Sequence, residues 1–167
     1  GISLKSNLKH FFFPSITRQY LFRILLVAVF AYIFFSFICL PFRIKGHSME
    51  PTYMNGDFNF CFKLRYVFSK PERHDVVAIR LAGEKVILLK RVVALEGDVV
   101  EIQKGALFVN EKKIDETYVR YPSDWNLSPR KVDKSNVYVV GDNRSVPIDV
   151  HQFGQTSIDR IIGVPLW

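Results

Sequence analysis

The chain has 167 residues and a formal net charge of +7, from 23 lysine and arginine residues against 16 aspartate and glutamate residues. The basic residues are scattered and form no recognised nucleic-acid module, so the charge indicates membrane lipid rather than nucleic acid as the partner. Without its one long apolar segment the chain keeps about 125 residues, enough for one compact domain and too few for a second large one.

The first predicted element is a transmembrane helix. An uncharged run, ILLVAVFAYIFFSFICLPF, covers residues 24–42 and is long enough at helical rise to span a hydrocarbon core of about 30 Å. We therefore assign residues 20–42 to an anchor, residues 1–19 to a short tail and residues 43–167 to the domain beyond it. The alternative is a cleaved secretory signal, but the run exceeds the usual apolar core, and no small-x-small site precedes Arg43.

Basic residues determine the predicted orientation of this anchor. They are more numerous before the apolar run than directly after it. The positive-inside rule then keeps the N-terminal tail cytoplasmic and places the following domain on the outer face of the membrane.

The sequence after the anchor predicts short strands. Phe58, Phe60, Phe62 and Leu64 alternate with other residues after a Gly-Asp turn, which is the two-residue period of a half-buried strand. Further segments rich in valine and isoleucine, separated by turn signals, are 75–81, 85–95, 99–103, 106–110, 137–140 and 160–164. Many short strands without a long amphipathic helix predict an all-β barrel or sandwich, and the polar segment 118–135 is expected to be a surface excursion.

The cysteines and the metal-ligating residues predict neither a disulfide nor a metal centre. Cys39 falls within the predicted anchor and Cys61 beyond it, so we expect no bond between them and expect Cys61 to pack as a small apolar residue. No cluster of His, Cys and carboxylate residues has ligand spacing, so neither a metal nor an organic cofactor is expected.

The candidate nucleophile is Ser48, in the stretch GHSMEPT that begins a few residues after the apolar run. A serine hydroxyl is a poor nucleophile until a base removes its proton, and histidine is the usual base. His10 lies on the predicted cytoplasmic side, and His47 is the adjacent residue, which an extended backbone would turn away from the serine. A triad through His74 or His151 stays open, without a supporting motif.

Lys90 is a better candidate base. It lies within VILLKRVV at residues 86–93, and apolar neighbours that remove water from an ammonium group lower its pKa. A shift from about 10.4 to about 8 requires about 3 kcal/mol, which desolvation alone can supply. Strand alternation allows Lys90 to point inward while Arg91 faces the other side. The alternative is an edge-strand lysine whose amine reaches solvent.

Three separated motifs match one pattern. GHSMEPT, KRVVALEGD from Lys90 and GDNRS from Gly141 follow a single anchor in the order and spacing of bacterial type I signal peptidases. The chain resembles this family of membrane-bound Ser-Lys endopeptidases from the anchor to Pro165, including its shorter relatives from organelle inner membranes and conjugative-transfer systems. The resemblance implies a signal-peptidase-like all-β domain outside an inner or cytoplasmic membrane, which cleaves signal peptides from exported preproteins.

The resemblance also implies roles for individual residues. Ser48 would be the nucleophile and would donate its backbone amide to the oxyanion, and Lys90 would be the general base. Arg91 would pair with Asp142 and so hold the Lys90 strand against the turn that carries Asp142. Further supporting positions are Gly46, Met49, Asn143, Arg144 and Ser145.

Two departures from the family pattern bear on mechanism. Many bacterial members supply a serine hydroxyl to the oxyanion where this chain has Gly46. Where the family often has a serine that hydrogen-bonds the lysine, this chain has Pro147, and Ser145 would substitute only if the loop is reshaped. Asp149 and His151 are candidates to replace the customary Asp-Arg ion pair.

Substrate and membrane contacts follow from the expected position of the site. A preprotein segment emerging from the membrane would add as an extended strand beside the site, and shallow pockets would select Ala-like side chains. We assign at least half of the aromatic residues that follow the anchor to the core. Tyr66, Val67 and Phe68 are assigned to a loop that contacts the membrane.

Two other interpretations stay open. A dedicated maturation peptidase for one pilin or conjugation substrate would fit the compact size and the segment VPIDVHQFG. A noncatalytic membrane-bound domain that binds extended peptides would fit the polar groups lost at Gly46 and Pro147, although Ser48 and Lys90 argue against it. The sequence does not indicate an oligomeric state.

Overall fold

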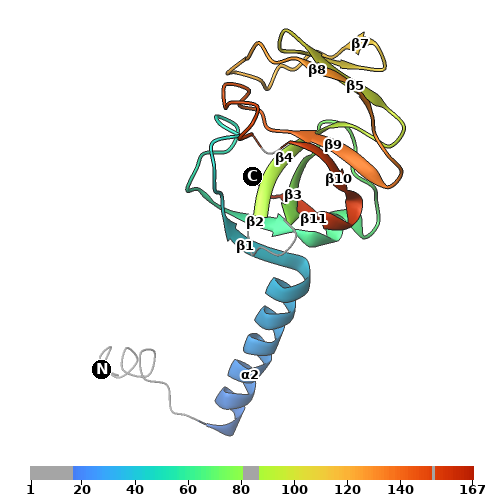
Figure 1. Cartoon of the computed structure of the whole chain (residues 1–167). Helices are drawn as coiled ribbons and strands as arrows, with labels where there is room; N and C mark the ends of the chain where they lie inside the picture. The colour runs from blue at the N-terminus through green and yellow to red at the C-terminus, as the bar shows by residue number, and fades with distance from the viewer. Residues whose placement is uncertain (1–16, 81–86, 152) are drawn as a thin grey trace. The chain divides into compact units, whose positions relative to one another are not determined.

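The structure, a computed structural model, describes residues 17–80, 87–151 and 153–167. The chain forms two compact units, residues 1–36 and residues 37–167. Figure 1 shows helix α2 in the first unit and the labelled strands in the second.

Helix α2 (Arg18–Ile33) begins after Thr17, whose hydroxyl accepts a hydrogen bond from the Tyr20 backbone N–H at 3.2 Å. The π-helical turn η1 (Phe34–Ile38) continues it, so that the apolar helical segment has 21 residues. No residue of α2 is buried, and apolar side chains exposed on every side suit lipid rather than water. The prediction of a helix long and apolar enough to cross a membrane is confirmed.

The predicted C-terminal limit of the anchor is wrong. The helical segment ends at Ile38, and strand β1 (Cys39–Arg43) follows directly. Pro41 explains the break, because proline has no N–H for a helix and disfavours helical geometry in the preceding residue. Phe42, the predicted last residue of the anchor, is therefore buried in the β unit.

The register of β1 places Cys39 outside the anchor to which the sequence assigned it. Cys39 lies opposite Phe62, and Cys61 lies opposite Leu40. Because neighbouring residues of a strand face opposite sides, the two thiols point to different faces of the sheet. Both are free and buried, so Cys39 belongs to the β unit and not to the anchor.

The described residues of the second unit form two antiparallel sheets (Figure 1). The larger sheet has the order β1-β2-β11-β3-β4-β9-β10 and the smaller β7-β6-β5-β8. The other strands of the larger sheet are β2 (Phe58–Phe62), β3 (Val76–Arg80), β4 (Ile87–Ala94), β9 (Asn136–Val140), β10 (Gly154–Ser157) and β11 (Ile161–Pro165). The smaller sheet holds β5 (Val99–Gln103), β6 (Ala106–Val109), β7 (Lys112–Lys113) and β8 (Leu127–Lys131), and two 3₁₀ turns are η2 (Lys63–Tyr66) and η3 (Ile158–Arg160). The predicted fold class, an all-β domain with one N-terminal apolar helix, is confirmed.

Strand β2 alternates as predicted, but it buries the opposite face. Asn59 and Cys61 are 1% and 0% exposed, whereas Phe58 is 51% exposed. Asn59 tolerates burial because its amide accepts a hydrogen bond from the Leu166 N–H at 3.1 Å and donates one to the Trp167 carbonyl. These contacts with the end of the chain could not be read from the alternation alone.

The segment 118–135 is more than the predicted surface excursion. Its residues 127–131 form β8, which pairs with β5. Trp125, Leu127 and Val132 are buried in an apolar cluster with residues of β4, β5, β6 and β9. The segment therefore closes one side of the core despite its polar composition.

Candidate active site

The nucleophile stretch follows β1 and is held by a buried side chain. Met49 is 2% exposed and packs in an apolar cluster with Phe42, Ile44 and Leu89. This packing anchors the backbone next to Ser48, which precedes Met49 and is partly exposed. Met49 is thus a buried core residue next to Ser48, and its support of the catalytic residues stays a prediction.

Gly46 is required by its backbone conformation. Its φ is +94°, a region that favours glycine over any residue with a side chain. Its N–H donates to Asn55 Oδ1 at 3.0 Å, so this amide is already bonded. By contrast, the described part of the chain provides no acceptor for the Ser48 N–H, which leaves that amide available as a donor.

Lys90 lies on β4 and is buried, being 2% exposed. Burial lowers its pKa to about 8, because the charged amine loses hydration. Its Nζ donates to the His151 carbonyl oxygen at 2.6 Å. Among the hydrogen bonds of the described residues there is none between the Ser48 hydroxyl and the Lys90 amine.

Gly141 lies between Ser48, the candidate nucleophile, and His151, whose carbonyl contacts Lys90. A Cβ placed on Gly141 would overlap the Ser48 carbonyl oxygen and lie 2.7 Å from His151 Nε2. Only glycine fits this gap, and its small size brings the Ser48 backbone close to the partner of Lys90.

The turn from Gly141 to Ser145 binds the nucleophile stretch directly. The Asn143 N–H donates to the Ser48 carbonyl at 2.9 Å, and its side-chain amide donates to the His47 carbonyl at 2.9 Å. Ser145 Oγ donates to Asn143 Oδ1 at 2.6 Å. The suggested substitution of Ser145 for the missing serine is therefore wrong, because its hydroxyl supports the turn instead of reaching Lys90.

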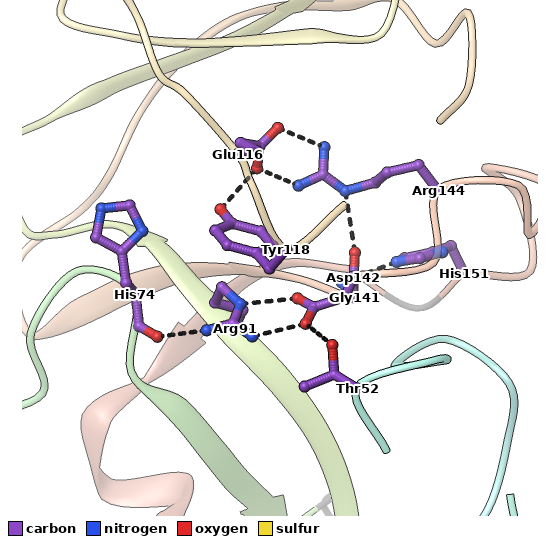
Figure 2. Close-up of polar contacts among 9 residues, drawn as sticks. All are labelled: Thr52, His74, Arg91, Glu116, Tyr118, Gly141, Asp142, Arg144 and His151. Carbon is purple, nitrogen blue, oxygen red and sulfur yellow. Dashed lines mark hydrogen bonds and ion pairs between the residues drawn. The ribbon is translucent and has the colours of Figure 1, made fainter. Parts of the chain in front are cut away.

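The predicted pair between Arg91 and Asp142 is confirmed (Figure 2). Arg91 Nε and Nη2 donate to the two carboxylate oxygens at 2.8 and 2.6 Å. Asp142 is fully buried and also accepts from Thr52 Oγ1 at 2.6 Å. One carboxylate thus joins β4, the turn after β9 and the nucleophile stretch.

Two further residues, Glu116 and Tyr118, complete this network and were not identified from the sequence. The Arg91 guanidinium lies 4.1 Å from the centre of the Tyr118 ring, and Tyr118 donates to Glu116 at 2.8 Å. Arg144, assigned a structural role, pairs with Glu116 and donates from Nε to the Gly141 carbonyl at 3.0 Å. Figure 2 shows the hydrogen bonds and ion pairs of these residues. No motif marks Glu116 or Tyr118, which lie far from the other site residues in the sequence.

His151 does not form the ion pair suggested for it. Its ring is 1% exposed, and Nε2 accepts from the Gly141 N–H at 2.9 Å. Burial, with the positive charges of Lys90 and Arg144, lowers its pKa to about 3, so the imidazole is neutral. Asp149 is exposed, and the ion pairs of the described residues do not join it to His151.

The proposed membrane-contact loop is exposed in part. Val67 and Phe68 are 64% and 86% exposed. Tyr66 is only partly exposed and donates its hydroxyl to Asp75 at 2.8 Å, which ties this residue to the domain. No group of three or more His, Cys, Asp and Glu residues within the described ranges is placed to hold a metal ion.

Comparisons with known proteins identify relatives over most of the chain. A family model described as "Signal peptidase, peptidase S26" matches residues 17–166. Thylakoidal processing peptidase 1, chloroplastic, of Arabidopsis thaliana is 35% identical over 142 residues, covering 78% of this chain and 42% of that protein. Signal peptidase I P of Bacillus subtilis subsp. natto is 32% identical over 152 residues, covering 84% of this chain and 82% of that protein.

Coverage differs among these relatives. The chain spans about 40% of the length of two thylakoidal proteins, with 42% and 38% covered. A solved structure of signal peptidase I from Enterococcus faecalis V583 aligns with 57% of this chain and 97% of that chain, with a TM-score of 0.48 and 26% identity.

Proposed function

The chain belongs to the signal peptidase family, peptidase S26, and from this membership we propose that it is a membrane-anchored serine endopeptidase that removes signal peptides from exported preproteins. The observation that carries the proposal is the buried amine of Lys90, whose partner His151 is separated from the Ser48 backbone only by Gly141. A Ser-Lys hydrolase needs a lysine whose lowered pKa lets its neutral amine accept the serine proton.

In the proposed reaction, the neutral amine of Lys90 removes the Ser48 hydroxyl proton as the oxygen attacks the scissile carbonyl. The Ser48 N–H stabilises the oxyanion of the tetrahedral intermediate. Lys90 then returns the proton to the leaving amine, and water hydrolyses the acyl-enzyme by the same route. Catalytic hydrogen bonds are often long without substrate, so we propose that the Ser48–Lys90 bond forms when the peptide binds.

The substrate is proposed to bind along an open edge of β4. Among the described strands, β9 pairs with β4 only from Arg91 onward, so the preceding residues pair only with β3. Val92 donates its N–H to Asp75, on the β3 side. Alternation then turns the backbone groups of Leu89 and Ile87 toward the open edge. An extended preprotein segment can pair there and present its scissile bond to Ser48.

The same edge supports a preference for small side chains before the cleaved bond. Leu89 packs with Phe42, Ile44 and Met49 in the buried cluster beneath Ser48. A peptide on this edge would rest its side chains on apolar surface that is already closely packed. Alanine-sized groups fit such a surface without displacing the cluster.

Cleavage is expected to accelerate with pH through about 8. Only the neutral amine accepts a proton, and a Lys90 pKa of about 8 leaves about one-tenth of it neutral at pH 7 and about nine-tenths at pH 9. The value of kcat/KM should therefore rise about tenfold per pH unit below 8 and level off above it, measured with a fluorogenic signal-peptide substrate. A flat profile, or a midpoint near the ordinary lysine value, contradicts the assignment of Lys90 as base.

The domain is proposed to lie on the outer face of the membrane, with the N-terminus cytoplasmic. The support is the charge distribution around the apolar helix Arg18–Ile38. Protease added to intact spheroplasts should digest the β unit without detergent, while a cytoplasmic marker protein stays intact. If the β unit resists the protease until detergent dissolves the membrane, the domain lies on the cytoplasmic face and the proposed orientation is wrong. Val67 and Phe68 are proposed to touch the lipid surface from the outer side.

A panel of unrelated preproteins tests the breadth of the activity. A general signal peptidase is expected to cleave most of them at the site that follows small residues. Cleavage of one pilin-like or conjugation substrate alone would favour the dedicated maturation peptidase. If the protein cleaves none of these preproteins, the proposed function is wrong.

A further inference from the structure

Lys90 is oriented by a main-chain carbonyl. Pro147 has no hydroxyl to offer the amine, and Ser145 is bonded to Asn143. The acceptor that the described residues provide for Lys90 Nζ is the carbonyl oxygen of His151, at 2.6 Å. A neutral amine has two N–H groups and one lone pair, so a fixed acceptor for one N–H restricts where the lone pair can point.

The His151 ring is clamped at the turn that holds the nucleophile. Its Nε2 accepts from the Gly141 N–H at 2.9 Å. Because an amide N–H can only donate, this nitrogen carries no proton, and the neutral ring must carry its proton on Nδ1. The centre of the Trp125 ring lies 4.7 Å from the centre of the His151 ring, edge-on, and the centre of the Phe153 ring lies 5.9 Å from it. Because these rings pack against the imidazole, it cannot turn freely.

Burying the His151 ring costs free energy at its other nitrogen, Nδ1. His151 Nδ1 is a buried side-chain atom without a hydrogen-bond partner, the only one among the described residues. An unpaired buried donor is unfavourable, and such exceptions call for an explanation. An apolar ring would fill the same space without that cost, so the bond to Gly141 is the feature that favours histidine.

We propose that His151 is a positioning residue for the catalytic base: its ring, bonded to Gly141, holds its own carbonyl against Lys90 and so directs the amine toward Ser48. The inference rests on the proposed function. Three observations support the proposal: the His151 carbonyl accepts from Lys90, the His151 ring accepts from Gly141, and Gly141 leaves no room for a side chain between His151 and Ser48. The nucleophile and the base are then aligned through the same glycine.

Burial, with the charges of Lys90 and Arg144, keeps the His151 ring neutral in the pH range where Lys90 titrates. Lys90 faces it from β4, and Arg144 faces it from the turn. Arg144 is itself paired with Glu116, while Asp149 is exposed. Arg160 lines a cavity of about 300 Å³ that also borders Lys90. The neutral His151 ring therefore does not itself titrate near pH 8, where Lys90 does.

Two amide substitutions separate the roles of the ring. In His151→Gln the side-chain oxygen can reach the position of Nε2 and accept from Gly141, whereas the shorter side chain of His151→Asn cannot. We expect His151→Gln to keep kcat within about threefold of the unsubstituted protein. We expect His151→Asn to lower kcat by about 30-fold or more with KM changed less than about threefold, because a misdirected base slows the chemical step.

The lysine pKa provides a readout that a merely structural role would not move. It is measured by NMR titration of the full chain in detergent micelles, labelled with ¹³C at the lysine ε-carbon, with Lys90→Arg to assign the signal. Burial lowers the Lys90 pKa, so His151→Asn should raise it as water reaches the amine. His151→Gln should leave it unchanged within about 0.3 unit.

The outcomes separate this inference from the proposed function. If His151→Asn leaves both kcat and the Lys90 pKa unchanged, the inference is wrong. It is also wrong if His151→Gln lowers kcat as much as His151→Asn does. If His151→Asn does not fold, the Gln variant decides, and a loss above about tenfold in its kcat contradicts the proposal. If the unsubstituted protein cleaves no preprotein, the proposed function fails, and the NMR titration still decides whether His151 positions Lys90.

Discussion

Alanine at Ser48 or at Lys90 is expected to reduce preprotein cleavage by at least about 10³-fold, because each substitution removes one half of the reacting pair. The double variant should lose no more than either single variant, since nucleophile and base act as a unit. The measurement is the single-turnover cleavage rate of a purified preprotein by the full chain in detergent micelles. Both variants should remain folded, as thermal unfolding checks, and only Lys90→Ala removes the cost of burying an amine.

Matched controls lie on strand β8. Ser128 and Lys131 are exposed there, and their alanine variants should cleave at the unsubstituted rate. Retention of more than about one-tenth of the rate in Ser48→Ala or Lys90→Ala would refute the Ser-Lys assignment. The noncatalytic peptide-binding interpretation instead predicts no cleavage by any of the proteins, including the unsubstituted one.

Asp142→Ala is expected to lower the free energy of unfolding by about 3–5 kcal/mol, because it leaves the buried guanidinium of Arg91 without its counter-charge. Arg91 donates two hydrogen bonds to this carboxylate, and Thr52 donates a third. The pair has side-chain exposures of 11% and 0%, so little water can replace the lost partner. Cleavage should fall as well, because the turn that holds Ser48 loses its link to β4.

The measurement is denaturant unfolding of the full chain, followed by tryptophan fluorescence. Asp133→Ala is the control, since Asp133 is exposed and its loss should cost no more than about 0.5 kcal/mol. A difference between the two variants below about 1 kcal/mol would show that the Arg91–Asp142 pair contributes little.

Local chemistry made several features predictable. Lys90 is buried because the valines and leucines around it form a strand that is largely buried. Arg91 must then face the other side, where it meets Asp142. The apolar helix follows in the same way from composition and length. In each case the residue type and its immediate neighbours contain the needed information.

The errors share a different cause. Cys39 and Phe42 are as apolar as the helix before them, and their place in β1 depends on pairing with β2. The inward face of β2 depends on Asn59 meeting Leu166 and the end of the chain. Each outcome was determined by a partner distant in sequence, which periodicity does not identify.

By itself, the sequence determined the apolar helix and the all-β class, and it named Ser48 and Lys90 as candidate nucleophile and base and Arg91 and Asp142 as a pair, because these follow from hydrophobic pattern and from motifs of adjacent residues. Only the tertiary structure decided that His151 contacts Lys90, that Gly141 separates His151 from Ser48, and that Glu116 and Tyr118 support Arg144 and Arg91. The physical reason is that hydrogen bonds and ring contacts depend on distances between atoms, and chain folding sets those distances between segments up to a hundred positions apart.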